Sequence, residues 1–236
     1  IYGNGAKVIK SIDGGVTFNA LPSSPGTTLA GYAIHFIAPS LGIASNGAQI
    51  FRTGDGGTTW FPIYGGSPID IANPTDYVYQ LHLSSDANTI IALTKRSVFR
   101  STDGGISFTN VFTFGDAFSQ PPNLTFVYGN DNYFIISSNI STNIYSSNNA
   151  GASWTAGPTG VSYASTIYES QKGFYAYYTT TGGGSSLIYE FEETSPGTFS
   201  STLSFTVPGA SPAQILSLTS AYSSTPCYTL TPCAPQ

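Results

Sequence analysis

The stretch Arg52-Thr53-Gly54-Asp55-Gly56-Gly57-Thr58-Thr59-Trp60 decides the fold, because three more stretches of the same form occur in the chain. They run over residues 11–18, 101–108 and 147–154. Each has a hydroxyl residue, an acidic or amide residue two positions later, a glycine two positions after that, and then a Ser or Thr followed by an aromatic residue. The acidic or amide positions are separated by 42, 48 and 46 residues, and a period of this size indicates an array of repeated supersecondary units.

Each copy lies between two stretches rich in β-forming residues, which predicts a hairpin whose connection contains glycine. An Asp or Asn near the start of such a connection accepts hydrogen bonds from the backbone N–H groups that follow. The shared glycine allows a positive φ at little steric cost, and the aromatic residue can bury against the next unit. The positions to which we assign this structural role are Asp13, Gly15, Phe18, Asp55, Gly57, Trp60, Asp103, Gly105, Phe108, Asn149, Gly151 and Trp154. A fifth, degenerate copy is expected at 195–199, where Thr194 stands in place of the acidic residue.

These four copies resemble the Asp-box, or BNR repeat, with the pattern Ser-x-Asp-x-Gly-x-(Thr/Ser)-Trp. Asp-boxes are found in β-propellers of sialidases, sortilin-type receptors, some glycosidases and photosystem II assembly factors. The resemblance implies a propeller in which the boxes are structural turns at the outer rim of the blades, away from the ligand face. It implies no activity by itself, and the chain resembles a non-catalytic member of this superfamily.

The order of the expected strands indicates an all-β fold, a five-bladed β-propeller. Residues 2–10 supply outer strands with no inner strand before them, and residues 213–218 form an inner strand with no outer strands after it. Joining them makes one composite blade, which closes the ring and removes open sheet edges. Part of a six- or seven-bladed propeller is the alternative. We expect the propeller to span residues 1–222 and a tail or linker rich in Pro, Thr and Cys to span 223–236.

Charged residues make up only 8% of the chain, against about 25% in ordinary globular proteins. The net charge is −5 and Lys and Arg together number seven, which disfavours a nucleic-acid groove. No stretch reaches the roughly 18 apolar residues that a membrane span needs. The neutral, hydroxyl-rich composition favours an extracellular, cell-surface or virion-surface location, and we expect no cofactor.

The two cysteines, Cys227 and Cys233, lie close together in the expected tail. In an oxidising compartment they could close a small disulfide loop; two free thiols or a bond to another chain are the alternatives. Sequons at Asn123 and Asn139 permit N-glycosylation if a eukaryotic host secretes the protein. No metal site is expected, because the two histidines lie far from the cysteines in sequence.

The resemblance also implies where a ligand would bind, because the loops entering the inner strands converge on the central channel, opposite the Asp-boxes. Aromatic rings stack on sugars, and carboxylates or amides bind sugar hydroxyls. The candidate ligand-binding residues in these loops are Tyr64, Asp70, Asn73, Asp76, Phe114, Asp116 and Phe118. The alternative is that each is an ordinary capping or turn residue of a long loop.

Catalysis is disfavoured. Sialidases resemble one another in an arginine triad, whereas this chain has only three arginines in all, and Arg52 and Arg100 occupy matching positions just before two of the copies. Their position indicates a role in the repeat. A two-carboxylate glycoside hydrolase could use carboxylates among Asp70, Asp76, Asp116 and Glu169, but no spacing marks a pair.

His35 and His82 lie on expected inner strands, where interior or channel-wall histidines are favoured over catalytic bases. The sequence thus predicts a non-catalytic extracellular module for recognition, adhesion or display. It would bind a glycan or a protein partner through the channel loops, or form a building block of a surface, filament or virion assembly. Further domains of the same polypeptide or copies of itself are possible partners, and a glycoside hydrolase is the alternative function.

Overall fold

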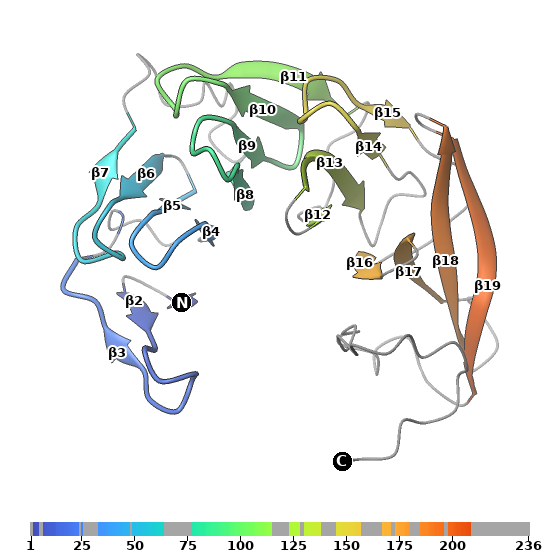
Figure 1. Cartoon of the computed structure of the whole chain (residues 1–236), viewed down its shortest axis with the longest axis horizontal. Coiled ribbons are helices and arrows are strands. Elements are labelled where there is room, and N and C mark those ends of the chain that lie inside the picture. The colour runs from blue at the N-terminus through green and yellow to red at the C-terminus, as the bar shows by residue number, and fades with distance from the viewer. Residues whose placement is uncertain are drawn as a thin grey trace.

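The computed structural model describes residues 2–4, 7–23, 25, 33–47, 49–63, 77–114, 123–127, 130–137, 145–156, 167–170, 173–179, 185–195 and 198–208. Within these residues the regular structure consists of β-strands and no helices. The strands form five separate sheets that follow one another around an arc (Figure 1). We number these sheets one to five in chain order.

Sheet one contains β1 (Tyr2–Asn4), β2 (Lys7–Lys10) and β3 (Asn19–Ala20). Sheet two contains β4 (Ile34–Phe36), β5 (Gly42–Ser45), β6 (Ile50–Thr53) and β7 (Phe61–Pro62). Sheet three contains β8 (Gln80–Leu83), β9 (Ile90–Leu93), β10 (Ser97–Ser101) and β11 (Thr109–Thr113). Sheet four contains β12 (Asn123–Val127), β13 (Asn130–Ser137), β14 (Tyr145–Ser147) and β15 (Thr155–Ala156). Sheet five contains β16 (Ile167–Ser170), β17 (Gly173–Thr179), β18 (Ser185–Ser195) and β19 (Thr198–Pro208).

Every sheet is an antiparallel meander, because strands that are hydrogen-bonded neighbours are also consecutive in the sequence. The first strands of sheets two to five lie in the same order as the chain: β4 contacts β8, β8 contacts β12, and β12 contacts β16. Sheets two to five therefore follow one another in space in the same order as in the chain. The all-β architecture expected from the sequence is confirmed.

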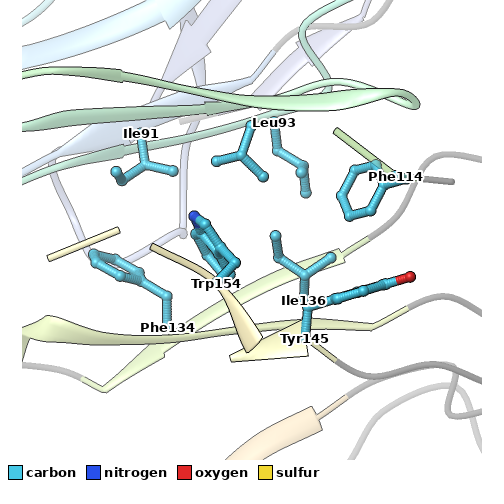
Figure 2. Packing of buried hydrophobic residues seen from close by; sticks show 8 residues of the cluster. Ile91, Leu93, Phe114, Phe134, Ile136, Tyr145 and Trp154 are labelled. Atoms are coloured by element: carbon cyan, nitrogen blue, oxygen red, sulfur yellow. The ribbon is translucent and has the colours of Figure 1, made fainter. Parts of the chain in front are cut away.

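The core lies between the faces of neighbouring sheets. All four residues of β9 are buried, as expected for a strand that is covered on both faces. Figure 2 shows the cluster between sheets three and four, which contains Ile91, Leu93, Val98, Phe114, Phe134, Ile136, Tyr145 and Trp154. A second cluster, between sheets two and three, contains Ala33, Ile43, Ile50, Val78, Leu81, Leu83, Ile90 and Ala92.

Sheet one has three strands where each of the others has four. In sheet one, β1 pairs with β2, and β2 pairs with β3. Sheets one and five stand at the two ends of the arc (Figure 1). The expected closing strand, 213–218, lies outside the described residues, as do the expected tail 223–236, Cys227, Cys233 and Asn139. Asn123 is the first residue of β12.

Sheet five differs from the expected repeat. Its strands β18 and β19 are 11 residues each, and their pairing continues as far as Ser195 opposite Thr198. Only two residues separate this pair in sequence, whereas seven separate β6 from β7. The degenerate fifth copy expected at 195–199 is therefore wrong: the strands pair through this segment, and Thr194 offers no carboxylate to organise a longer turn.

Candidate functional site

The four repeated turns, which we call turns one to four (residues 11–18, 53–60, 101–108 and 147–154), share one hydrogen-bond network. In turn two, Thr53 Oγ1 donates to Asp55 Oδ1 (2.9 Å) and accepts the Gly57 N–H (2.8 Å). Asp55 Oδ1 also accepts the Thr59 N–H (2.9 Å), and Asp55 Oδ2 accepts the Thr59 hydroxyl (2.6 Å). The Asp55 carboxylate thus accepts hydrogen bonds from residues at both the start and the end of the turn.

The same contacts recur in turns one and three, where Asp13 and Asp103 accept the hydroxyls of Thr17 and Ser107 at 2.6 Å. In turn four the direction of one bond is reversed, because Asn149 Nδ2 donates to Ser153 Oγ (2.8 Å). Asn149 Oδ1 still accepts the Ser153 N–H (3.0 Å). The amide therefore reproduces the carboxylate geometry without a charge.

Hydrogen bonds to the ionised form lower a carboxyl pKa. The hydroxyl and N–H of Thr17, with the Ser11 hydroxyl, lower the pKa of Asp13 to about 2. The hydroxyl and N–H of Thr59 likewise lower the pKa of Asp55 to about 2. Ser107 and Ser101 hold the pKa of Asp103 far below its ordinary value. All three side chains are therefore ionised hydrogen-bond acceptors at neutral pH.

Turns two, three and four are also fixed to the first two strands of their own sheets or to the hairpin between them. The Gly56 N–H donates to Ser40 O (2.8 Å), the Gly104 N–H to Asn88 O (2.9 Å) and the Ala150 N–H to Asn132 O (3.0 Å). These three donors have left-handed backbones, with φ of 74°, 72° and 57°. Because the fourth strand runs away from the turn, the last residues of β7 and β11 lie at the other end of their sheets.

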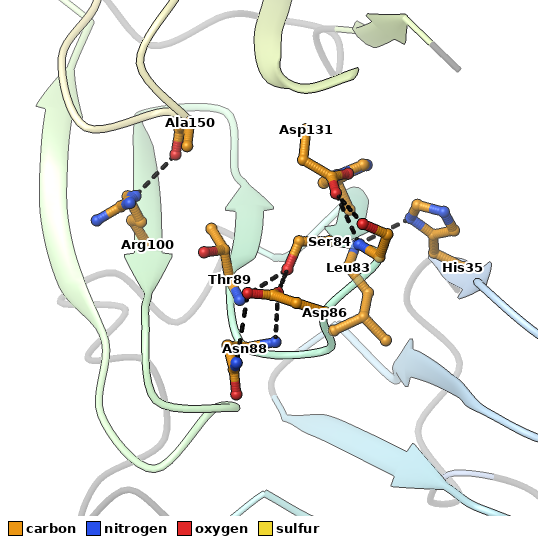
Figure 3. Close-up of polar contacts among 11 residues, drawn as sticks. His35, Leu83, Ser84, Asp86, Asn88, Thr89, Arg100, Asp131 and Ala150 are labelled. Carbon is orange, nitrogen blue, oxygen red and sulfur yellow. Dashed lines mark hydrogen bonds and ion pairs between the residues drawn. The ribbon is translucent and has the colours of Figure 1, made fainter. Parts of the chain in front are cut away.

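A cation from one sheet reaches the turn of the next. Lys10 Nζ donates to Gly56 O (3.1 Å), and Arg100 Nε donates to Ala150 O (2.7 Å; Figure 3). Arg52 Nη1 donates to two carbonyls of sheet three, Ala87 O (3.4 Å) and Gly104 O (3.5 Å). The three cations occupy matching positions, one residue before the hydroxyl of their own turn. The role in the repeat predicted for Arg52 and Arg100 is therefore a junction between sheets, which we call the cation junction.

A second polar network joins sheets two, three and four near their first strands. His82 Nε2, on β8, lies 3.1 Å from Asp131 Oδ1, on β13. Asp131 Oδ2 accepts the N–H (2.8 Å) and hydroxyl (2.6 Å) of Ser85. His35 Nδ1, on β4, accepts the Leu83 N–H (3.0 Å), as Figure 3 shows. The His35 and His82 rings are 4.8 Å apart between centroids.

The electrostatics of this network keep His82 neutral and Asp131 charged. Burial, reinforced by His35, lowers the pKa of His82 to about 4 against the opposing effect of Asp131. Burial also lowers the pKa of His35. Burial raises the pKa of Asp131, but the bonds from Ser85 and His82 outweigh it and hold the pKa below its ordinary value. His82 then donates its Nε2–H to the carboxylate and carries no charge at neutral pH.

This arrangement has the chemistry of a structural clamp. His82 is 3% exposed and packs edge-on against Phe134, so a substrate has little access to its ring. The other described carboxylate near the network, Asp86, accepts hydrogen bonds from Ser84 and Asn88. Among the described residues, no group of three or more His, Cys, Asp or Glu side chains could hold a metal ion. The sequence suggested interior histidines here, but no local signal indicated Asp131.

Six of the seven candidate ligand-binding residues lie outside the described residues: Tyr64, Asp70, Asn73, Asp76, Asp116 and Phe118. The seventh, Phe114, is 4% exposed and belongs to the cluster between sheets three and four (Figure 2). Its ring lies 5.4 Å from Phe112 and 5.3 Å from Tyr145, centroid to centroid. Phe114 therefore takes part in core packing at the start of its loop. Glu169 lies within β16.

Proteins similar to this chain are found by comparing its structure with solved structures. No protein-family model and no curated protein sequence matches the chain. YCF48 bound to D1 peptide is 19% identical over 78% of this chain and 56% of its own, with a TM-score of 0.52. A GH74 enzyme from Niastella koreensis is 22% identical over 70% of this chain and 24% of its own, with a TM-score of 0.51.

A chain of the nidogen/laminin complex is 12% identical over 75% of this chain and 65% of its own, with a TM-score of 0.50. The chain has a β-propeller-type fold. It spans little more than half of the YCF48 chain and about a quarter of the GH74 enzyme. Within its described part, no helix is long and apolar enough to cross a membrane.

Proposed function

We propose that this chain is an extracellular or surface-displayed recognition module without catalytic activity, built on a five-bladed Asp-box propeller. Turns one to four are its Asp-boxes, and sheets one to five are its blades. Residues 213–218 pair with β1 and complete sheet one, so that the two ends of the chain close the ring. The binding face is the one opposite the turns, where the segments 64–76 and 115–122 connect the sheets.

The observation that carries the proposal is the structural use of the described polar side chains. The three turn carboxylates hold their own turns, the three junction cations bond to backbone carbonyls, and Asp131 joins two sheets. In the described part of the chain, these groups act as a frame rather than as acids or bases. The loops held by this frame on the opposite face are left for recognition, since loops on a rigid scaffold commonly carry binding residues.

The fold neighbours are compatible with a partner-binding role. YCF48 is seen with a D1 peptide and nidogen with laminin, so propellers of this general form can bind proteins. The low charge and the many hydroxyl and aromatic residues of this chain also suit a sugar ligand, through stacking and hydrogen bonds. We therefore propose a glycan or a protein partner at the channel loops.

A glycoside hydrolase is the second candidate, because a GH74 enzyme shares the fold. Its carboxylates would come from Asp70, Asp76 and Asp116 in the loops, or from Glu169. This reading requires two carboxyl groups about 5–10 Å apart across one bound sugar.

A glycan array combined with hydrolysis assays on the retained sugars separates these functions. Retention without release of reducing ends supports the recognition module, and turnover that the Asp70→Asn and Asp116→Asn variants abolish would establish the hydrolase instead. Tyr64→Ala should weaken retention, whereas Thr102→Ala, an exposed change in turn three on the opposite face, should leave it unchanged. If no glycan is retained, a surface-protein or peptide display library takes the place of the array, and failure of both rejects the recognition proposal.

A further inference from the structure

The turn between β9 and β10 carries two adjacent cations, Lys95 and Arg96. The chain contains only seven Lys and Arg residues, and these are the only two that follow one another in the sequence. The connections between the second and third strands of sheets two, four and five, residues 46–49, 138–144 and 180–184, contain no charged residue. The cation pair is therefore not part of the repeat, unlike the cations of the cation junctions.

The backbone of this turn is fixed by hydrogen bonds to Thr94, which is fully buried. Thr94 Oγ1 accepts the N–H groups of Arg96 (3.1 Å) and Ser97 (2.9 Å). Arg96 O accepts the Phe114 N–H (2.8 Å). Arg96 itself is exposed. The turn thus presents a cation at the surface from a fixed backbone, and such preorganisation lowers the entropic cost of binding.

Two tyrosine rings lie beside the turn. Tyr79, directly before β8, donates its N–H to Leu93 O (2.9 Å), which places it next to the start of the turn. Lys95 Nζ lies 5.5 Å from the centroid of the Tyr79 ring, a cation–π contact. The Tyr77 ring is 6.4 Å from the Tyr79 ring, centroid to centroid, at an angle of 78°. Both tyrosines are partly exposed. With the adjacent Arg96 these side chains form one group, which we call the tyrosine–cation cluster (Tyr77, Tyr79, Lys95 and Arg96).

The tyrosine–cation cluster lies at the end of sheet three that is remote from turn three, because β10 runs from the cluster to that turn. The segments 64–76 and 115–122 adjoin the cluster in the sequence. The first ends directly before Tyr77, and the second begins directly after Phe114, whose N–H is bonded to Arg96 O. The cluster is therefore the described part of sheet three nearest to both segments in the chain.

The chemistry of the cluster fits an acidic sugar better than an extended peptide. The backbone N–H groups of Val78, Tyr79 and Arg96 are bonded within the protein, so they are not available for strand pairing with a peptide. Recognition then falls to the side chains. A tyrosine ring stacks on the C–H face of a sugar, and its hydroxyl bonds to sugar hydroxyls. A guanidinium binds a carboxylate or sulfate through two parallel hydrogen bonds.

We propose that the tyrosine–cation cluster binds a glycan that carries a carboxylate or sulfate group, which rests on the recognition function proposed above and names its ligand class. Arg96 and Lys95 bind the anionic group, and Tyr77 and Tyr79 contact the sugar ring that carries it. The ligand class follows from these four side chains. The chain's net charge of −5 repels anions at a distance, so the attraction is confined to the cluster.

An array that pairs each carboxylated or sulfated oligosaccharide with its methyl-esterified or desulfated form tests the proposal on the full chain. At about 0.15 M salt, the acidic member of at least one pair should be retained about tenfold more tightly than its neutral member. Calorimetric titration with that oligosaccharide then compares variants. Arg96→Gln should weaken binding about tenfold, the loss expected for a hydrogen bond between charged groups.

Lys172→Gln is the matched control, because it removes the same charge from the connection between β16 and β17. It should leave the affinity unchanged. Tyr79→Leu keeps an apolar side chain but removes the ring, and should weaken binding about threefold to tenfold. Urea unfolding of each variant checks that it is folded.

The proposal is overturned if no acidic oligosaccharide is preferred over its neutral form, or if Arg96→Gln and Lys172→Gln have equal effects. Polyglutamate that binds as tightly as the retained glycan, with the same dependence on Arg96, would also overturn it, because a carboxylate alone would then suffice. Retention of neutral glycans only would reject the anionic ligand and leave the recognition function standing. Hydrolysis of a retained acidic glycan would support the cluster and reject the non-catalytic function.

Discussion

Acid should weaken the contact between sheets two, three and four through His82, before it affects the repeated turns. Burial and the neighbouring His35 ring hold the pKa of His82 at about 4, against 6.5 for a histidine in water. Between these two values the unfolded chain carries a proton that the folded chain does not bind. The free energy of unfolding is therefore largest above pH 6.5 and falls as the pH is lowered toward 4. The difference between the pKa values of His82 in the unfolded and folded chain corresponds to a fall of about 3 kcal/mol in the free energy of unfolding. The lowered pKa of His35 changes this free energy in the same direction.

The neighbouring carboxylates titrate in a separate range. Asp131, which faces His82, has a pKa below its ordinary value, so it stays ionised while His82 is the group that responds. The pKa values of Asp13 and Asp55 are about 2. Their contribution to stability is present above the ordinary aspartate pKa near 4 and is lost as the pH falls toward 2. A decline between pH 6.5 and 4.5 therefore reports the histidines.

Urea unfolding at pH 7.5, 6.5, 5.5 and 4.5, followed by tryptophan fluorescence, measures this decline. In His82→Gln, the side-chain amide can still donate to Asp131 but cannot titrate. We expect the variant to lose some stability at pH 7.5 and to have a much flatter dependence on pH than the original chain. Most of the pH-dependent fall in the free energy of unfolding, about 3 kcal/mol in the original chain, should be absent in the variant. An unchanged slope in His82→Gln would refute the assignment of the decline to this residue.

Three further predictions test the turns and the cation junctions by urea unfolding at pH 7.5. Gly104→Ala should lower the free energy of unfolding by about 1–2 kcal/mol, the cost of a left-handed alanine; turn four already tolerates Ala at this position. Gly105→Ala should lower it by at least about 3 kcal/mol, because its added Cβ also overlaps an isoleucine of sheet two. Equal effects of the two substitutions would contradict the role of that contact. Trp60→Phe should change stability by less than about 1 kcal/mol, since its buried Nε1 has no hydrogen-bond partner among the described residues and Phe occurs at this position in turns one and three. Trp154→Phe should lower the free energy of unfolding by about 1–3 kcal/mol more than Trp60→Phe does, because it leaves the Gly151 carbonyl without its donor. A larger loss in Trp60→Phe than in Trp154→Phe would contradict this reasoning. Arg100→Met keeps the aliphatic stem but removes the donor to Ala150 O, and should cost about 2 kcal/mol; no loss would show that this junction contributes only packing.

The turns could be predicted from the sequence because their stabilising contacts are local. The hydroxyl, the carboxylate and the glycine of turn two lie within a few residues of one another, so a short pattern contains the whole network. The prediction of a fifth copy was wrong because this local network is incomplete there. Without a carboxylate at Thr194, nothing in the segment holds a seven-residue turn, and strand pairing extends to Ser195 and Thr198 instead.

Contacts between sheets could not be predicted in the same way. The acceptor of Arg100 is the carbonyl of Ala150, 50 residues later, and Asp131 is 49 residues from His82. Both pairs depend on how one sheet is placed against the next, and no spacing within a single repeat records that placement. Phe114 illustrates the same limit, because its position at the start of a long loop suggested a ligand contact, whereas its ring completes the core beside Tyr145.

The cation junctions also explain how the chain folds with so few charged residues. Each cation donates to a backbone carbonyl in a turn whose backbone is left-handed at that residue, so no carboxylate is needed to receive it. Ser146 occupies the position of Lys10, Arg52 and Arg100 in sheet four, and sheet five, which follows it, has a direct hairpin between β18 and β19 in place of a repeated turn. At the three cation junctions, both the cation and the repeated turn that accepts its hydrogen bond are present. Between sheets four and five, both are absent. This pairing is expected if the cation's function is to hold the next turn, and it would be a coincidence if the cations served only solubility.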